Sequence, residues 1–249
     1  FNQDIGRWDL SSATKLSYLF AGAVAFDQDI GDWNVSRANT LSRTFKDATS
    51  FNQDIGGWEV SSVTDLSETF RGATLFNQDI GDWNVSSVTN MRETFKSAAA
   101  FNQDIGDWNA SAATNMEQMF NDATSFNQDI GEWNPSAVTN MTSMFNNTSS
   151  LSDANKGLIE TSFATNANWP YDWSAHVFIP PPLTDANFTT AVNLWFSDEA
   201  NATATYGHIS NWDVSNVTDM EEAFKDRASF NEDISDWDVG NVTDMERMF

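Results

Sequence analysis

The 249-residue sequence contains no cysteine and only two histidines. This excludes disulfides and cysteine-based metal sites. Basic residues are also scarce, because 12 Lys and Arg stand against 36 Asp and Glu, which gives a formal net charge of −24 at pH 7. We expect no nucleic-acid partner, since such binding depends on cationic side chains that neutralise phosphates. The apolar runs are short, so we also expect no membrane insertion within this segment.

Catalytic motifs are missing as well. His176 and His208 lie in neither HExxH nor any comparable arrangement, and no GxSxG sequence is present. Carboxylates are abundant, but in so acidic a chain their proximity to one another indicates no particular chemistry. The sequence therefore predicts a protein that is not an enzyme and has no catalytic residues and no bound cofactor.

The sequence does have a 25-residue internal repeat. A fixed period of this length is typical of stacked repeat architectures. The 33 aromatic residues, 19 of them Phe and 11 Trp, supply enough apolar surface for a core. Copies begin at Phe1, Phe26, Phe51, Phe76, Phe101 and Phe126, with a weaker copy at Thr205 and a truncated one at Phe230.

Within one coil, whose positions we number 1 to 25, two hydrophobic periods occur. Apolar positions 8 and 10 alternate with polar neighbours, which favours a half-buried strand. Positions 13, 16, 20 and 23 match one face of a short helix. Asn or Asp at position 15 and Glu or Gln at position 18 have the spacing of a capping box. The predicted fold is an α/β repeat: a right-handed, leucine-rich-repeat-like β/α solenoid of 25-residue coils with stacked parallel strands.

Three other columns of the repeat predict structural roles. Position 6 is Gly in the first six coils but Ser210 and Ser235 later, which favours a crowded backbone over a required positive φ. Trp at position 8 is predicted to pack in the core, with a sugar-stacking ladder as the alternative. Asn and Gln at positions 2 and 3 are expected to form amide ladders between coils.

The period fails between residues 151 and 204. We predict residues 1–150 to be a solenoid array of six coils, 151–204 a cap and junction with two helices and a Pro-rich linker, and 205–249 the start of a second array. The junction helices are expected at Ser152–Ala164, with Ser152 as N-cap, and at Thr184–Ser197. Each array would keep one free stacking face.

Asp recurs at position 4, and stacked carboxylates must be stabilised. Hydrogen bonds from backbone N–H groups of the adjacent Ile-Gly corner would suffice; a Ca²⁺ site is the alternative. This column contains Asp4, Asp29, Asp54, Asp79, Asp104 and Asp129. N-x-Ser/Thr sequons also recur, and those proposed as glycosylation candidates are Asn34, Asn84, Asn109, Asn216 and Asn241.

The run Asp-Ile-x-x-Trp-Asn/Asp-Val-Ser-x-Val-Thr-Asn/Asp-Met-x-x-x-Phe, seen at Asp79–Phe95 and Asp233–Phe249, resembles the BspA-like bacterial surface protein repeat. That repeat also occurs in mycoplasma lipoproteins that carry a domain of unknown function. The resemblance covers about 1–150 and 205–249. It implies a relative of leucine-rich repeats in a secreted or surface-anchored protein with an adhesion-like role, and it brings no catalytic residues.

The sequence thus predicts an extracellular or cell-surface repeat protein acting in adhesion or as a structural scaffold. It would bind a protein partner, or associate with itself through its end coils. Two alternatives are a head-to-tail subunit of an extracellular filament and a glycan- or Ca²⁺-dependent binding module.

Overall fold

The computed structural model describes residues 1–249 and divides into two compact units, Phe1–Phe178 (unit 1) and Ile179–Phe249 (unit 2). Unit 1 contains one α-helix, α1 (Asp153–Phe163), and a 3₁₀ turn, η1 (Ser174–His176). Unit 2 contains α2 (Phe188–Ser197), α3 (Glu199–Tyr206) and a 3₁₀ turn, η2 (Ile209–Asn211). No helix combines the length and the apolar character needed to cross a membrane.

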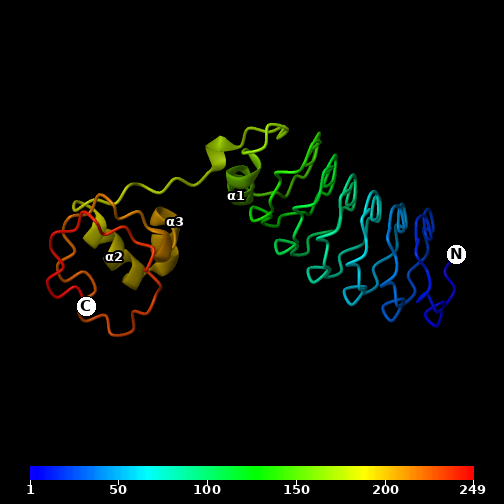
Figure 1. Cartoon of the computed structure of the whole chain (residues 1–249), viewed down its shortest axis with the longest axis horizontal. Coiled ribbons are helices and arrows are strands. Elements are labelled where there is room, and N and C mark those ends of the chain that lie inside the picture. Colours follow the sequence, from blue (N-terminus) through cyan, green and yellow to red (C-terminus); the bar gives the residue numbers. More distant parts are fainter. The chain divides into compact units, whose positions relative to one another are not determined.

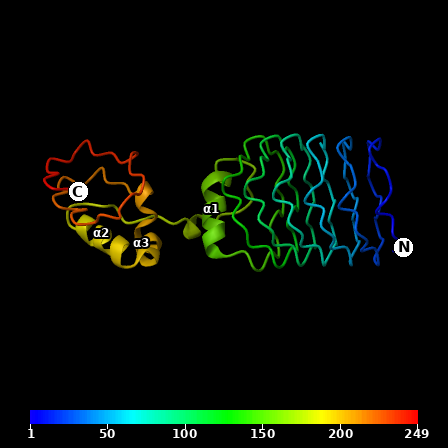
Figure 2. The ribbon, with the colours of Figure 1, turned by 90° about the horizontal axis from the view of Figure 1, so that it is seen from below.

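In unit 1 the 25-residue coils lie side by side, and α1 lies across the last of them (Figures 1 and 2). The apolar positions of the repeat form one continuous core. In the fourth coil, for example, Phe76 and Ile80 are fully buried and Trp83 is 3% exposed. Packing of Trp at position 8 in the core is therefore confirmed for the interior coils.

Identical side chains form columns along the stack. Phe rings at position 1 lie nearly parallel, with centroids 5.9–6.3 Å apart between adjacent coils. Position 20 of each coil also stacks on position 1 of the next, as in Phe70 on Phe76 at 4.0 Å. Each coil thus buries its aromatic face only because a neighbouring coil covers it, as expected for a repeat protein.

The predicted parallel strands are wrong. Adjacent coils share only isolated parallel bridges at position 15, such as Thr40 with Asp65 and Asp65 with Asn90, and no sheet forms. The physical reason is spacing. Trp centroids at position 8, in the predicted strand, are 6.1–6.5 Å apart, whereas paired strands lie about 4.8 Å apart. The descriptions as a β/α solenoid and as leucine-rich-repeat-like are corrected accordingly.

The predicted helix in each coil is also absent. Along positions 16 to 22, every second N–H donates to the next coil, as Glu93 N does to Glu117 O (2.8 Å). Others close turns within the coil, as Lys96 N does on Glu93 O (3.2 Å). We call positions 16 to 22 the turn segment. Two residues of each turn segment are left-handed, such as Glu93 with φ 54° and Ser97 with φ 57°. Left-handed residues at these two positions prevent the segment from forming an α-helix.

The coils of unit 1 approach one another most closely along this turn segment. Phe rings at position 20 are only 5.4–5.7 Å apart, compared with 6.1–6.5 Å for the Trp rings at position 8. Because both sets of rings are nearly parallel, these separations report the coil spacing on two sides of the stack. The stack therefore curves, with the position-20 side concave and the position-8 side convex.

Polar columns fix the register of the coils. The Trp83 indole Nε1 donates to the Ile55 carbonyl of the preceding coil (3.1 Å). The predicted amide ladder is present: Asn52 Oδ1 accepts from the backbone N–H of Asn77 (2.9 Å) and from Gln78 Nε2 (3.0 Å). Such bonds recur between successive coils, so the stack cannot slip without breaking many of them.

Glycine at position 6 is explained by crowding, as predicted. A Cβ on Gly56 would lie 2.6 Å from the carbonyl oxygen of Asp79 in the next coil. That contact is too short for any real Cβ, while the φ of Gly56 is outside the left-handed region. Adjacent Gly57, in contrast, has open space around it.

A cap covers the last coil of unit 1. Helix α1 starts where predicted, with Ser152 Oγ accepting from Asn155 N (3.2 Å). The ring of Phe145 is covered by aromatic residues after the helix, including Trp173 with centroids 5.4 Å apart. The Tyr171 hydroxyl accepts a hydrogen bond from Phe145 N (2.8 Å). Core residues of the sixth coil are thereby shielded from water.

Unit 2 begins with helices and ends with coils. Helix α2 starts at Phe188 rather than at the predicted Thr184, and α3 was not predicted. They pack with the coil residues around Trp212 and Trp237 in a second core. The Trp237 indole repeats the inter-coil bond of unit 1 by donating to Ile209 O (2.9 Å).

Candidate interaction surfaces

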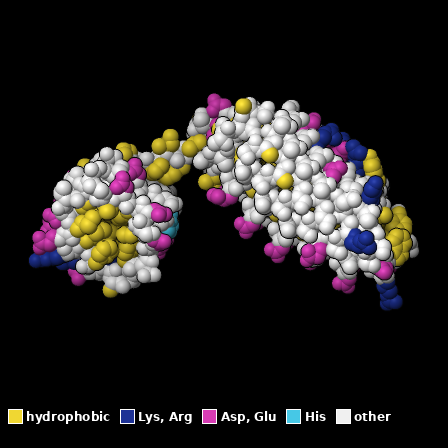
Figure 3. Space-filling model, viewed as in Figure 1, with side chains coloured by type: hydrophobic (Ala, Val, Ile, Leu, Met, Phe, Trp, Pro, Cys, Tyr) yellow, Lys and Arg dark blue, Asp and Glu magenta, His cyan; other side chains and the backbone are white.

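Exposed carboxylates line the convex side of unit 1. We call this surface the acidic edge; Figure 3 shows Asp and Glu side chains spaced along one edge of the unit. All of its members are exposed. At position 4 they are Asp4, Asp29, Asp54, Asp79, Asp104 and Asp129, and at position 7 they are Asp32, Asp82, Asp107 and Glu132.

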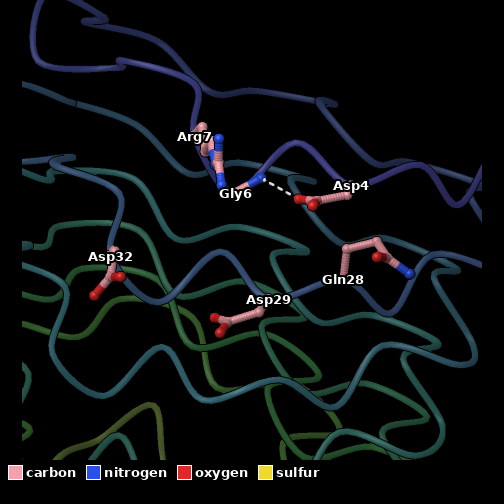
Figure 4. A pocket seen from close by; sticks show the side chains of 6 residues that line it. All are labelled: Asp4, Gly6, Arg7, Gln28, Asp29 and Asp32. Carbon is pink, nitrogen blue, oxygen red and sulfur yellow. Dashed lines mark hydrogen bonds between the residues drawn. The ribbon is translucent and has the colours of Figure 1, made fainter.

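Each position-4 carboxylate accepts a hydrogen bond from the backbone N–H of the glycine two residues later in its own coil. Asp4 Oδ1 accepts from Gly6 N at 3.0 Å (Figure 4), and the same bond measures 2.7–3.0 Å in the next five coils. The hydrogen-bonding interpretation of the column thus has a geometric basis. Shallow hollows lie between adjacent coils along this edge. One has a volume of about 330 Å³ and is lined by Asp4, Gly6, Arg7, Gln28, Asp29 and Asp32.

The structure does not gather this Asp column into a cluster of metal ligands. Three carboxylates with oxygens within 4.8 Å of one another occur instead in unit 2, at Asp219, Glu221 and Asp244, all exposed. There, Asp219 Oδ1 accepts from Glu221 N (2.9 Å) and so serves a turn. Ca²⁺ binding by the position-4 column remains a prediction.

A second surface carries the opposite charge. It comprises five Lys and Arg side chains of coils two to four at positions 17, 18 and 21, which flank the concave side; we call it the basic strip. Several Lys and Arg are visible on the edge of unit 1 opposite the acidic edge (Figure 3). Each side chain of the basic strip is 22–33% exposed. The members are Arg43, Lys46, Arg71, Arg92 and Lys96.

Two buried carboxylates organise the basic strip. Glu68, 2% exposed, accepts from Arg43 Nη2 (2.6 Å) and Lys46 Nζ (2.8 Å). It also pairs with Arg71 Nη1 (2.9 Å) and Arg92 Nη1 (3.1 Å). Glu93, 3% exposed, pairs with the same two guanidinium groups. A buried carboxylate needs such partners, because its desolvation otherwise costs several kcal/mol.

The charge state of Glu68 follows from these contacts. Burial alone would raise the pKa of its carboxyl group. The hydrogen bonds from Arg43, Lys46 and Arg71 together outweigh burial, so the pKa of Glu68 lies well below its usual value. Glu68 is therefore ionised at neutral pH, and the ion-pair network around it is charged there.

The sequence analysis missed the basic strip. The available signal was the distribution of charge, because five of the 12 Lys and Arg of the chain occupy three positions of three consecutive coils. Positions 2 to 6 hardly vary between coils, whereas positions 17, 18 and 21 do. Only the fold shows that these variable positions share one side of the stack.

The sequon asparagines at position 9 face solvent, as expected for that position. Asn34, Asn84 and Asn109 are exposed, and Asn84 Oδ1 accepts from Ser86 N (3.1 Å) and Ser86 Oγ (2.6 Å). Asn216 and Asn241 are likewise exposed. Glycosylation of these residues remains a prediction.

The Trp column offers no sugar-stacking surface in the interior coils, because Trp33 through Trp133 are 2–3% exposed. Apolar residues are exposed on the outer faces of the first and last coils, where Phe1 is 63%, Trp8 56% and Phe249 74% exposed. Interior coils cover the equivalent faces with a neighbour. Association through these faces remains a prediction.

Stacked coils with capping elements define a repeat protein. The family model described as "Mycoplasma protein of unknown function, DUF285" matches residues 1–77, 53–158 and 188–249. Since these segments cover most of the sequence, the chain belongs to this family. Comparison with curated proteins and with solved structures gave no match.

Proposed function

We propose that this chain belongs to a non-enzymatic repeat protein of the cell surface or extracellular space that acts in adhesion or as a structural scaffold. The observation that carries the proposal is the column architecture of unit 1. Core rings, the Asn–Gln ladder and the Trp indole bonds repeat in each interior coil. Its lateral surfaces therefore present side chains at fixed intervals, without a cleft in which a small substrate would be enclosed.

Sequence resemblance supports the same proposal, whereas the family model, a repeat family of unknown function, supports only the repeat architecture. The resemblance of Asp79–Phe95 to the BspA-like surface repeat favours an exposed, adhesion-like role. The polar side chains that face outward, including the acidic edge, would keep such a rod soluble and hydrated.

The proposal is tested on cells that express the protein. Antibody labelling of intact cells and brief protease treatment should detect and remove the repeat region without lysis. Beads coated with the chain should bind to cells or extracellular matrix more strongly than beads coated with an equally acidic protein. A protein that is protected from both reagents until lysis, and whose beads bind no better than the control, would contradict the proposed role.

A further inference from the structure

The two charged surfaces of unit 1 are complementary, and this carries an inference beyond the proposed function that does not depend on it. We propose that the basic strip of one copy binds the acidic edge of a second copy, so that unit 1 associates laterally with itself. The partner is identified by charge, by repeat spacing and by curvature.

The basic strip has an excess of positive charge within a strongly acidic protein. Its ion-pair network joins five cations to three carboxylates, Glu68, Glu93 and Glu117. Exposed Asp47, one residue beyond Lys46, leaves five cations against four carboxylates, and the part-buried Asp65 carboxylate accepts a hydrogen bond from Ser67 N in its own turn. The strip thus attracts carboxylates, while the remainder of the chain is net negative.

Donors of the basic strip remain free although its side chains are held in place. Arg71 bonds Glu68 only through Nη1, so its Nε and Nη2 are available for an incoming carboxylate. The planar guanidinium group suits a carboxylate, which it can bind through two parallel bonds. Because Glu68 and Glu93 already fix the Arg side chains, little conformational entropy would be lost on binding.

The acidic edge supplies carboxylates at a matching interval. Both surfaces are columns of the same stack, so each carries one or two charges per coil. The spacing on the two sides of the stack differs by about 1 Å per coil, which flexible Lys and Arg side chains absorb over three coils. Each position-4 Asp uses Oδ1 for its own Gly corner and keeps its other oxygen for a partner.

Curvature also agrees with this pairing. The basic strip flanks the concave side and the acidic edge lies on the convex side, so the convex edge of one copy can face the concave side of another. The contact joins two different surfaces, so in a pair one copy retains a free acidic edge and the other a free basic strip. Such heterologous contacts do not close on themselves and generate extended arrays.

The test uses the full chain and two variants of equal net charge. The edge variant combines Asp29→Asn, Asp54→Asn, Asp79→Asn and Asp104→Asn, which remove charge but retain an oxygen for the Gly corner. The matched control combines Asp213→Asn, Asp219→Asn, Asp238→Asn and Asp244→Asn, exposed unit 2 residues whose Oδ1 atoms accept equivalent backbone bonds. Sedimentation equilibrium at high protein concentration and about 0.15 M NaCl measures association while salt screens the long-range repulsion.

We expect the wild-type chain and the control to associate, and the edge variant to associate at least about tenfold more weakly. Salt of about 1 M should weaken wild-type association, because it screens exposed ion pairs. Equal association of the edge variant and wild type, or association that persists in high salt, would overturn the proposal and favour apolar stacking of end coils. A wild-type chain that remains monomeric would also overturn it, and binding of poly-glutamate by that monomer would assign the strip to another acidic polypeptide.

A mixing experiment tests whether the contact joins the basic strip of one copy to the acidic edge of the other. A strip variant, Lys46→Gln with Arg71→Gln, leaves Glu68 paired with Arg43 and Arg92. The strip and edge variants should each stay monomeric alone but form dimers, and nothing larger, when mixed. Absence of mixed dimers between two folded variants would contradict the assignment of the two surfaces. Should the strip variant fail to fold, the edge variant and its control still decide the question.

Discussion

Unit 1 and unit 2 contain the same repeat, but the equivalent residues of the two units have different neighbours. Equivalent residues consequently have different roles. Position 18 shows this clearly. Glu68 in unit 1 is 2% exposed and pairs with four cations. Glu222 in unit 2 is 39% exposed and pairs with Lys225 and Arg247. Neighbouring coils on both sides convert an ordinary surface carboxylate into the centre of a buried network.

The largest difference between the units should appear at position 1. Phe76→Ala removes a fully buried ring and should destabilise unit 1 by about 3–5 kcal/mol. Phe230→Ala in unit 2 should cost much less, since Phe230 is only partly buried. Urea unfolding, with hydrogen exchange assigning the change to a unit, measures both. Equal costs would contradict the burial of the Phe column by stacked coils.

The second-largest difference in stability loss between the two units should come from neutralising the carboxylate at position 18. Glu68→Gln leaves four cations around an uncharged amide and should cost about 3 kcal/mol or more, as for breaking a buried ion pair. The exposed pair should make Glu222→Gln cost no more than about 1 kcal/mol. Thermal unfolding of the two variants gives the comparison. A Glu68→Gln protein as stable as wild type would show that the network is not stabilising.

The ionisation of Glu68 also predicts that the stability of unit 1 depends on pH in the acid range. The pKa of Glu68 is lower in the folded protein than its ordinary value. Stability from this group is therefore fully present above the unfolded-state pKa and is lost as the pH falls below it towards the folded-state pKa. Unit 1 of wild type should lose stability in that acidic range, and Glu68→Gln should lose less. Unfolding measured across acid pH tests this, and parallel profiles for the two proteins would refute it.

Substitution of the glycine at position 6 should reduce stability moderately, and the adjacent glycine provides a control. Gly56→Ala places a Cβ against Asp79 O at 2.6 Å, so the coils must move apart, at a cost of about 1–3 kcal/mol. Gly57→Ala meets no atom within 4 Å and should be neutral or slightly stabilising. Melting temperatures of the two variants decide between crowding and a general need for glycine. Two similar losses would reject crowding as the cause.

The smallest expected effect is at the helix caps. Ser152→Ala removes the side-chain acceptor for Asn155 N at the start of α1, and Asp198→Ala removes that for Asn201 N at the start of α3. Each should cost about 1 kcal/mol, the first in unit 1 and the second in unit 2. Hydrogen exchange of the two helices measures the loss. Faster exchange spreading through all coils of unit 1 in Ser152→Ala would indicate that the cap controls the entire stack.

Much of the core could be predicted from the sequence, because burial follows the period directly. The apolar columns, the crowding at Gly56, the Asn52 ladder and the cap at Ser152 all follow from residue type and spacing. The turn segment could not be recognised in the same way. Asp65 and Glu68 have the spacing of a capping box, yet Asp65 Oδ1 accepts from Ser67 N (2.9 Å) and Glu68 is left-handed at φ 53°.

The sequence nevertheless contained a local signal for the left-handed conformation in the turn segment. Position 22 is Gly, Asp or Asn in most coils, including Asp47, Gly72 and Asn147, and these residue types tolerate left-handed φ. The strand prediction failed for another reason. Alternation of Trp83 and Val85 reports burial on one side of the backbone but not the distance to the next coil. The basic strip likewise depends on which columns the fold brings to the same side.

Residue-resolved hydrogen exchange of unit 1 tests the central claim, that coils are joined through the turn segment and not through strands. The account predicts strong protection at positions 16, 18, 20 and 22, as for Met91, Glu93, Phe95 and Ser97, whose N–H groups donate to the next coil. Asn84 and Val85, in the predicted strand, should exchange faster than these four. Strong protection along 82–85, with weak protection at Glu93 and Ser97, would contradict it.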